Sequence, residues 1–323
     1  GLSIEDLELI LHPMAEEGKE ASGSMGDDTP VAVLSSHFRP VSHYFRQNFS
    51  QVTNPPIDSL RENKVMSLKT RFGNLGNILD FDNLTEENIY VLDSPILTNS
   101  EFNKFKKFFS KKTKQLDCTF DTSSSLKDRI EEIREEAETS VREGSTCLIL
   151  TDKNISDKKA SIPSILTVGA VHSYLVKQGL RGYCSLNVEC SDALDTHSFA
   201  VLIGVGATTV NPYLAIDSIY QRFEKKLFGK SDFQSCVMKF KKSIDAGLLK
   251  IMSKMGISVI SSYRGGCNFE AVGLSRAIVS DYFPGMSSRI SGIGVIGIEK
   301  KIKELHTKFN SKNVFTLPIG GLY

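Results

Sequence analysis

The sequence lacks any long apolar run and any excess of charge of one sign. No stretch approaches the roughly 20 apolar residues that a helix needs to cross a bilayer. Lysine and arginine number 39 against 38 aspartates and glutamates, so the net charge of +1 gives no polyelectrolyte character. Neither nucleic acid nor a membrane is therefore indicated as a partner. The opening residues 1–10 are acidic rather than basic, unlike a signal peptide, and we expect a cytoplasmic protein.

Closely spaced cysteines are also missing. Six cysteines are scattered along the 323 residues, and no two form the C-x-x-C pair that is typical of zinc ribbons and thiol redox centres. Four of them lie in apolar segments of the sequence, where a free thiol behaves as a small hydrophobic side chain. We therefore expect buried, reduced thiols with no metal or redox role. The six are Cys118, Cys147, Cys184, Cys190, Cys236 and Cys267.

Several catalytic and nucleotide-binding motifs are absent as well. There is no G-x-x-x-x-G-K-[ST] loop and no complete G-x-G-x-x-G after a strand, which argues against a P-loop and a Rossmann site. H-E-x-x-H and G-x-S-x-G do not occur, so neither a zinc protease nor an α/β-hydrolase is indicated. The six histidines include one pair, His37 and His43, and the rest are isolated. We expect them to be structural or to lie on the surface.

The sequence does contain a repeated alternation of strand-like and helix-like segments. Continuous apolar runs, typical of strands buried on both faces, are followed by amphipathic segments, and this order favours a parallel sheet covered by helices. Ser3, with Asp6 three positions later, is a suitable N-cap for the first helix, which should end near Gly18. The spacing leaves open whether the sheet is an open, doubly wound one or a closed or partly closed barrel. The expected strands are 31–35, 88–97, 146–152, 182–190, 197–204 and 257–263, and the expected helices are 3–18, 40–52, one from 57, 126–144, 165–179, 212–227 and 234–256.

Three short segments could contact a ligand. The first is "GSMGDD", residues 23–28, whose glycines allow backbone N–H groups to approach an anion, while its paired aspartates could bind a hard cation. The residues alone leave a ligand loop and a simple turn equally open. Residues 204–213, "GVGATTVNPY", could admit a phosphate or form a tight turn, and Arg264 in "SYRGG" could contact an anion.

Longer motifs, in a fixed order from about residue 4 to about residue 300, resemble the central region of the large subunit of glutamate synthase. They are long and close to the family form, which makes the resemblance more specific than any single glycine pattern. The motifs are "HPMAEEGKEASGSMGDDTPVAVLS", "FSQVTNPPIDSLRE", "IPSILTVGAVHSYL", "GVGATTVNPYLA" and "GLLKIMSKMGISVISSYRGG".

The resemblance implies a particular fold and enzyme. In this family the central domain joins a glutamine amidotransferase domain to an FMN-binding (β/α)8 barrel that carries a 3Fe-4S cluster. The whole enzyme passes ammonia from glutamine through an internal tunnel and makes glutamate from 2-oxoglutarate, with NADPH, NADH or ferredoxin as electron donor and in some cases a small reductase subunit as partner. The central domain is α/β and similar to a degenerate or partial TIM barrel, with parallel strands covered by helices.

The resemblance also implies what this chain contains. We expect residues 1–323 to be the central domain, with residues from about 285 onward leading into an FMN-binding domain that lies outside the sequence. The catalytic cysteine of the amidotransferase and the cluster cysteines are expected to lie outside it too, so the isolated chain should contain no cofactor and be catalytically inactive. The alternative is a stand-alone barrel enzyme or small-ligand binding protein that reuses this domain.

Two loops are the sites that the resemblance implies. Ser24, Met25, Gly26 and Asp27, together with the "TNPP" turn carrying Thr53 and Asn54, are expected to face the ammonia path and the edge of the synthase site. A flexible methionine and a few neutral hydrogen-bonding groups suit the passage of ammonia, which fixed charges would trap. The alternative is that both loops only brace neighbouring domains.

The sequence departs from the family pattern in two regions, 194–208 and 266–268. The residues that differ are Leu194, Ser198, Val205, Thr208, Gly266, Cys267 and Asn268. We expect these changes to affect contacts between domains, while the two loops named above keep the family form.

Overall fold

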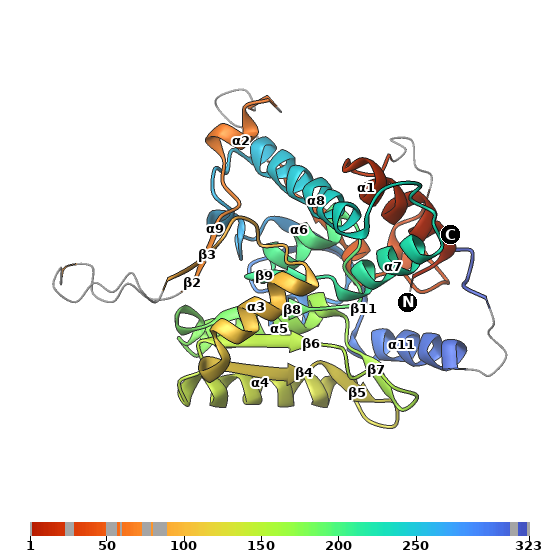
Figure 1. Cartoon of the computed structure of the whole chain (residues 1–323). Helices are drawn as coiled ribbons and strands as arrows, with labels where there is room; N and C mark the ends of the chain where they lie inside the picture. Colours follow the sequence, from red (N-terminus) through yellow and green to blue (C-terminus); the bar gives the residue numbers. More distant parts are fainter. Residues whose placement is uncertain are drawn as a thin grey trace.

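A parallel four-stranded sheet forms the centre of the computed structural model (Figure 1). The structure describes residues 2–22, 29–49, 57–58, 60–72, 79, 89–310 and 316–321. The strand order is β4-β6-β8-β9, with Thr113 opposite Cys147, Cys147 opposite Ser185, and Asn187 opposite Thr209. The strands are β4 (Thr113–Asp117), β6 (Cys147–Thr151), β8 (Ser185–Glu189) and β9 (Thr209–Asn211).

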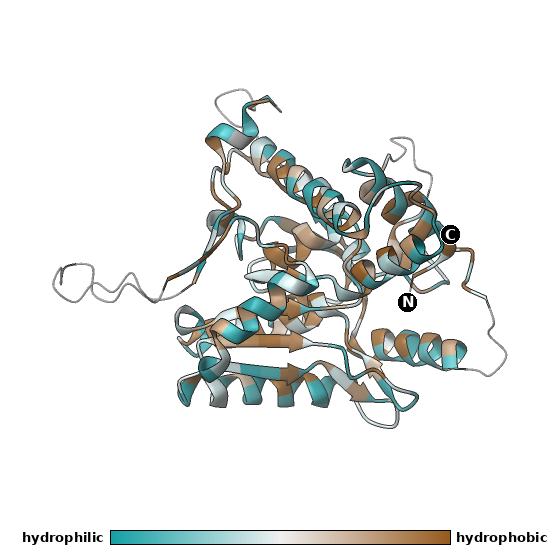
Figure 2. Ribbon diagram, in the orientation of Figure 1, coloured by the Kyte–Doolittle hydropathy of each residue, from teal (hydrophilic) through white to brown (hydrophobic). Residues whose placement is uncertain are grey.

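Helices cover both faces of this sheet, as the alternation in sequence predicts. Every residue of β6 is buried, and successive side chains belong to different apolar clusters. Cys147 and Ile149 join the aromatic cluster that includes α3 (Asn99–Phe108), whereas Leu148 and Leu150 join the main core. Because side chains alternate along a strand, this division shows that the sheet is a layer between two apolar faces. Figure 2 shows the apolar strands inside and the polar outer surface of α4 (Leu126–Arg142).

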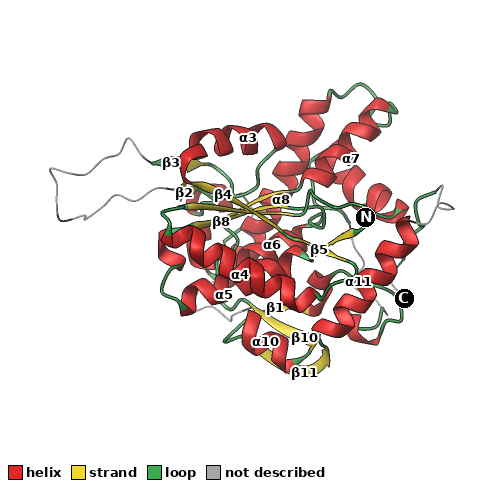
Figure 3. Ribbon diagram, turned by 90° about the horizontal axis from the view of Figure 1, so that it is seen from below, coloured by secondary structure: helices red, strands yellow, loops and turns green. Residues whose placement is uncertain are grey.

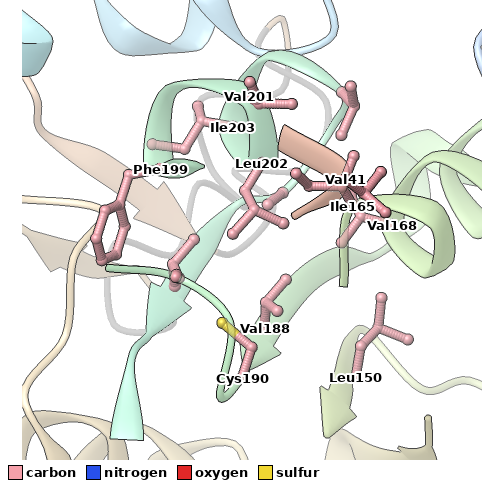
Figure 4. Packing of buried hydrophobic residues seen from close by; sticks show 14 of the residues in the cluster. Val41, Leu150, Ile165, Val168, Val188, Cys190, Phe199, Val201, Leu202 and Ile203 are labelled. Atoms are coloured by element: carbon pink, nitrogen blue, oxygen red, sulfur yellow. The ribbon is translucent and has the colours of Figure 1, made fainter. Parts of the chain in front are cut away.

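The main core lies between the sheet, α5 (Ser164–Lys177) and α6 (Thr196–Gly204). From Phe199 to Ile203 no side chain of α6 is exposed to solvent. Figure 4 shows Leu202 of this helix near Val188 of β8 and Ile165 of α5. Side chains of this size contribute roughly 1.5–3 kcal/mol each when fully buried, so α6 is a principal source of stability.

Smaller units surround this centre (Figures 1 and 3). A second sheet has the order β1-β10-β11, with β1 antiparallel to β10 and β10 parallel to β11, and two-stranded sheets pair β2 with β3 and β5 with β7. The long helix α8 packs on α1, α6 and α7. The strands concerned are β1 (Phe45–Gln47), β2 (Thr70–Phe72), β3 (Tyr90–Leu92), β5 (Thr119–Asp121), β7 (Lys159–Ser161), β10 (Phe269–Leu274) and β11 (Ser287–Ile293). The helices are α1 (His12–Glu17), α2 (Glu62–Val65), α7 (Tyr213–Glu224), α8 (Phe233–Met255), α9 (Ile260–Tyr263), α10 (Arg276–Tyr282) and α11 (Val295–Asn310).

The class α/β with a helix-covered parallel sheet is confirmed. In the described residues the strands form four separate sheets, and a closed barrel is not confirmed. The first helix begins as expected, because the Ser3 hydroxyl accepts a hydrogen bond from the Asp6 N–H at 3.1 Å. It ends at Gly18, whose φ of 71° is the left-handed conformation of a helix C-cap. None of the described helices is long and apolar enough to cross a membrane.

Four expected elements are different in the structure. Residues 197–204 form helix α6 rather than a strand, because Asp195 caps it by accepting a hydrogen bond from the Ser198 N–H at 2.9 Å. Residues 31–35 contain a short 3-10 helix, Ala32–Leu34, and Leu34 is 72% exposed. Residues 257–263 contain the short helix α9, and within 40–52 a 3-10 helix, Val41–Tyr44, leads into β1. Apolar runs of this length have no periodicity that separates a buried strand from a buried helix.

Candidate functional site

The two loops implied by the sequence resemblance lie outside the described residues. Ser24, Met25, Gly26 and Asp27 fall in 23–28, and Thr53 and Asn54 fall in 50–56. The structure does describe the residues that flank these two segments, and we call them the loop anchors: Glu20, Pro30, Asn48 and Ile57.

Two of the loop anchors are held by the same helix. The Glu20 carboxylate is ion-paired with Lys250 of α8. The Ile57 carbonyl accepts a hydrogen bond from the Ser253 hydroxyl at 2.9 Å, and Ser253 lies less than one turn further along α8. A described residue before the first segment and one after the second therefore contact the same stretch of α8.

The carboxyl ends of the parallel strands bring together polar residues that the sequence did not single out. Ligands of open α/β sheets bind at this edge, so its chemistry decides whether the domain has a site of its own. Each of the four strands contributes a polar side chain at this edge, from its last residue or from the residue that follows the strand. We call them the carboxyl-edge cluster: Asp117, Thr151, Asp152, Glu189 and Asn211.

Glu189 is the most strongly bound member of the cluster. Its carboxylate is 3% exposed and ion-paired with Lys106 Nζ at 3.2 Å and Lys153 Nζ at 2.8 Å. The Thr151 hydroxyl donates to it at 2.8 Å. Burial raises the pKa of Glu189, but the hydrogen bonds from Lys153 and Thr151 and the charge of Lys106 outweigh burial and leave the pKa lowered. A carboxylate so firmly ionised is a poor general base.

Asp152 lines a small cavity at this edge. Its Oδ2 accepts hydrogen bonds from the Ser161 hydroxyl at 2.9 Å and the Ser191 N–H at 3.2 Å. Its Oδ1 and the Asn211 Oδ1 are buried without a partner among the described residues. The cavity beside Asp152 and Glu189 has a volume of about 10 Å³. That volume is close to the minimum for one water molecule and leaves no room for a substrate or a flavin.

A larger hollow lies on the surface of α11. Its volume is about 640 Å³. Every residue that lines it belongs to that one helix, so the described residues provide no opposing wall from which other groups could converge on a ligand. The lining residues are Ile296, Glu299, Lys300, Lys303, Glu304, Thr307 and Lys308.

The remaining candidates from the sequence have structural contacts. Residues 204–213 end α6, turn at Gly206 with φ 126°, and pass through β9 into α7. Arg264 donates from Nε to the Ala207 carbonyl at 3.1 Å, so it binds that turn. His12 stacks on Phe228 with ring centroids 4.8 Å apart. Burial, followed by the charge of Arg39, lowers the pKa of His43 to about 4.

The burial expected for the cysteines is confirmed for five of the six. Cys118, Cys147, Cys184, Cys190 and Cys236 are buried as free thiols, and Cys267 is exposed. Cys267 has a positive φ of 53° in the turn between α9 and β10, where the chain reverses at the surface. Over the described residues, no three histidine, cysteine, aspartate or glutamate side chains gather into a group that could hold a metal ion.

The sequence reasoning missed the carboxyl-edge cluster. Its members are single polar residues at the ends of apolar runs, as in "TCLILTD" and "SLNVEC", and no motif marks them. The expectation of parallel strands could have revealed the cluster, because the carboxyl ends of such strands meet at one edge of the sheet.

Comparison with known proteins defines the class to which this α/β domain belongs. Residues 1–275 match the family described as "Glutamate synthase central domain". The chain is 57% identical over 326 residues to the large chain of the NADPH glutamate synthase of Azospirillum brasilense, covering 100% of this chain and 22% of that protein. It is 39% identical over 312 residues to the corresponding Bacillus subtilis chain (95% and 20%), and 39% identical over 308 residues to the ferredoxin-dependent glutamate synthase of Spinacia oleracea (91% and 19%).

The chain therefore belongs to the glutamate synthase central domain family. It spans about a fifth of the length of the curated relatives named above.

Solved structures give only weak likenesses. The flavin-binding domain of baker's yeast flavocytochrome b2 matches with a TM-score of 0.35 at 12% identity, covering 61% of this chain and 41% of that one. A mandelate oxidase with benzoyl-formic acid matches with a TM-score of 0.33 at 10% identity, covering 82% and 97%. These scores are too low to support an argument about a barrel.

Proposed function

We propose that this chain acts as the structural central domain of a glutamate synthase large chain, connecting a glutamine amidotransferase domain to an FMN-binding synthase domain. The observation that supports the proposal best is the 57% identity along the whole of this chain to about a fifth of the Azospirillum large chain. The proposal assigns residues 1–323 to the central domain, with residues from about 285 onward leading into the FMN-binding domain. The four-stranded parallel sheet is compatible with a degenerate (β/α)8 barrel.

The reaction of the longer enzyme would be the synthesis of glutamate from glutamine and 2-oxoglutarate. Relatives are named as NADPH, NADH and ferredoxin-dependent enzymes, so their names leave the electron donor and a small reductase subunit undecided. FMN and a 3Fe-4S cluster would belong to another domain. The filled carboxyl edge supports this division, because a cavity of about 10 Å³ beside Asp152 does not fit a flavin. We assign no catalytic step to this chain.

The two loops are the parts of this chain that we propose to face the ammonia path. Ser24, Met25, Gly26 and Asp27 would present a flexible apolar side chain and backbone groups, and Thr53 and Asn54 would offer hydrogen bonds to neutral ammonia. The loop anchors support a common location, since Glu20 and Ile57 contact Lys250 and Ser253, three residues apart on α8. Two loops that start and end beside one another can line one passage.

The mass of the native polypeptide tests the assignment to a larger enzyme. An antibody raised against this chain should detect, in extracts of the source organism, a protein four to five times the mass of the 35.7 kDa chain, because the chain covers 22% and 20% of two relatives. A single band near 36 kDa would contradict the proposal and favour a stand-alone enzyme or binding protein.

A further inference from the structure

Two arginines from distant parts of the sequence converge on one turn. Arg181 follows α5 and donates from Nη2 to the Gly206 carbonyl at 2.9 Å. Arg264 follows α9 and donates to the next carbonyl, that of Ala207, at 3.1 Å. Both side chains therefore bind consecutive peptide groups of the turn between α6 and β9. We call Arg181 and Arg264 the arginine pair, and residues 206–208 the 206–208 turn.

The arginine pair has no acidic partner. Within the described part of the chain no carboxylate lies within ion-pair distance of Arg181 or Arg264, although three other arginines that are buried or nearly so are paired. Arg129 binds Glu132 and Glu136, Arg134 binds Glu131 and Asp281, and Arg222 binds Glu8. Burial, followed by the charge of Arg181, lowers the pKa of Arg264 to about 10. Two neighbouring cations held by backbone carbonyls and the neutral His172 ring make this the least neutralised of these arginine sites.

A third hydrogen-bond donor lies beside the pair. The Nδ1 of His172 accepts a hydrogen bond from Arg181 Nε at 3.0 Å, which leaves the proton of a neutral imidazole on Nε2. Burial, followed by the charge of Arg181, lowers the pKa of His172 to about 4, so the ring is neutral near pH 7. His172 Nε2 lies beside Gly265, since a Cβ added to that glycine would stand 3.2 Å from it. The cluster thus consists of donors.

The residues that follow each member of the arginine pair in the chain are exposed to solvent. Gly182, Tyr183, Gly265 and Gly266 are exposed, and Tyr183 is 69% exposed. Gly265 has a φ of +67°, a backbone conformation that residues other than glycine rarely adopt. Backbone with left-handed residues presents N–H groups that suit anions. Arg181 and Arg264 themselves keep some exposed surface, which gives a small ligand access to the pair.

We infer that Arg181, Arg264 and the Nε2–H of His172 form a binding site for one oxyanion, a carboxylate or phosphate group. A planar guanidinium binds either group through two parallel hydrogen bonds, and an anion would neutralise charge that the 206–208 turn balances only with dipoles. In a longer polypeptide the group could be an aspartate or glutamate of a neighbouring domain, and otherwise a free anion. Both sources share the same chemistry.

Thermal unfolding in phosphate tests the site. The chain is titrated with inorganic phosphate or with acetate at constant ionic strength, sodium chloride being the balancing salt, and the midpoint of unfolding is recorded. We expect a saturable rise in the midpoint with at least one of the two anions. Arg264→Gln should raise the half-saturating concentration by at least about tenfold, as expected for the loss of a charged hydrogen bond.

Two variants serve as controls. Arg264→Lys keeps the charge and should retain part of the response, while Arg129→Gln removes an arginine that already has two carboxylate partners and should keep the full response. Each variant is compared with its own midpoint in chloride, so a change in basal stability does not obscure the result. No saturable rise in the unsubstituted chain, or the same half-saturating concentration in Arg264→Gln, would overturn the inference.

The longer polypeptide separates the two sources. If a carboxylate of another domain occupies the site, the isolated chain should bind phosphate and the longer polypeptide should not. If the ligand is a free anion, both should bind it with similar affinity. The inference does not depend on the ammonia path, because the arginine pair and the loop anchors involve different residues.

Discussion

At the scale of single residues, Asp245 shows how burial alters an ionisable group. It lies on α8 and accepts a hydrogen bond from the Ser94 hydroxyl at 2.6 Å. Burial raises the pKa of Asp245 to about 6, against the lowering effects of Ser94 and Lys241. Between its ordinary pKa of 3.8 and about 6, the folded chain holds a proton that the unfolded chain loses. The contribution of Asp245 to stability is therefore complete below pH 3.8 and decreases as the pH rises to 6.

Asp245→Asn should remove this pH-dependent loss. The amide oxygen can still accept the hydrogen bond from Ser94, and no charge is buried. We expect a gain of about 1–2 kcal/mol in the free energy of unfolding at pH 8 and little change at pH 4, measured by urea denaturation. Asp217→Asn, at an exposed position of α7, should have no such effect. An equal effect of Asp245→Asn at both pH values would show that burial does not shift this carboxyl group.

At the same scale, the sequence predicted only part of the site chemistry. Arg264 was recognised as a residue that could contact an anion, but its partner Arg181 was not. The two are 83 positions apart, and only the packing of the 206–208 turn brings them together. Glu189 was missed for a similar reason, because its lysines come from α3 and from the loop after β6. Contacts between segments that are far apart in the chain produce no motif that can be recognised in a single sequence.

At the scale of elements, local signals were sufficient where a helix is amphipathic and capped. The helices 126–144 and 234–256 were predicted within a few residues of α4 and α8, which combine N-caps, charged outer faces and glycine ends. Helix α6 was predicted as a strand because the segment "HSFAVLIG" contains only apolar residues and glycine after its first two positions. The helix is buried along nearly its whole length, so its sequence shows no polar face. Tertiary packing, rather than amphipathicity, stabilises this helix.

The crossing of α6 and α8 gives a prediction for Gly247. A Cβ at this position would lie 2.4 Å from Thr196 Cγ2. Glycine to alanine in a helix usually gains about 1 kcal/mol, but here the clash requires the two helices to separate. We expect Gly247→Ala to destabilise the chain by about 1–3 kcal/mol in thermal or urea unfolding. Lys254→Ala, at an exposed position of α8, should be close to neutral, and a stabilising effect of Gly247→Ala would contradict this packing.

At the scale of the whole molecule, the described residues leave only about 10 Å³ in the cavity beside Asp152 and Glu189 at the centre of the sheet edge. The carboxyl edge of the sheet, where related architectures bind ligands, is occupied by the carboxyl-edge cluster and by lysines that neutralise Glu189. The family match places this domain in proteins about five times longer. This edge is in keeping with the connecting role proposed above.

The small size of this cavity predicts weak flavin binding. The purified chain should be colourless, and titration with FMN, followed by flavin fluorescence, should give a dissociation constant of about 1 mM or weaker, because the cavity beside Asp152 and Glu189 holds only about 10 Å³. Yellow protein with bound FMN after gel filtration would contradict the proposed division between this domain and an FMN-binding domain.

The most direct test of the central claim is the coupling between glutamine hydrolysis and glutamate synthesis in the full-length enzyme carrying Met25→Trp. If the loop around Met25 faces the ammonia path, the larger side chain should lower glutamine-dependent glutamate synthesis by about tenfold, equivalent to roughly 1.4 kcal/mol, while flavin reduction is retained. Leu60→Trp, at a residue that is 85% exposed, should leave the coupling unchanged. Unaltered coupling in Met25→Trp would contradict the claim that this domain lines the path of ammonia.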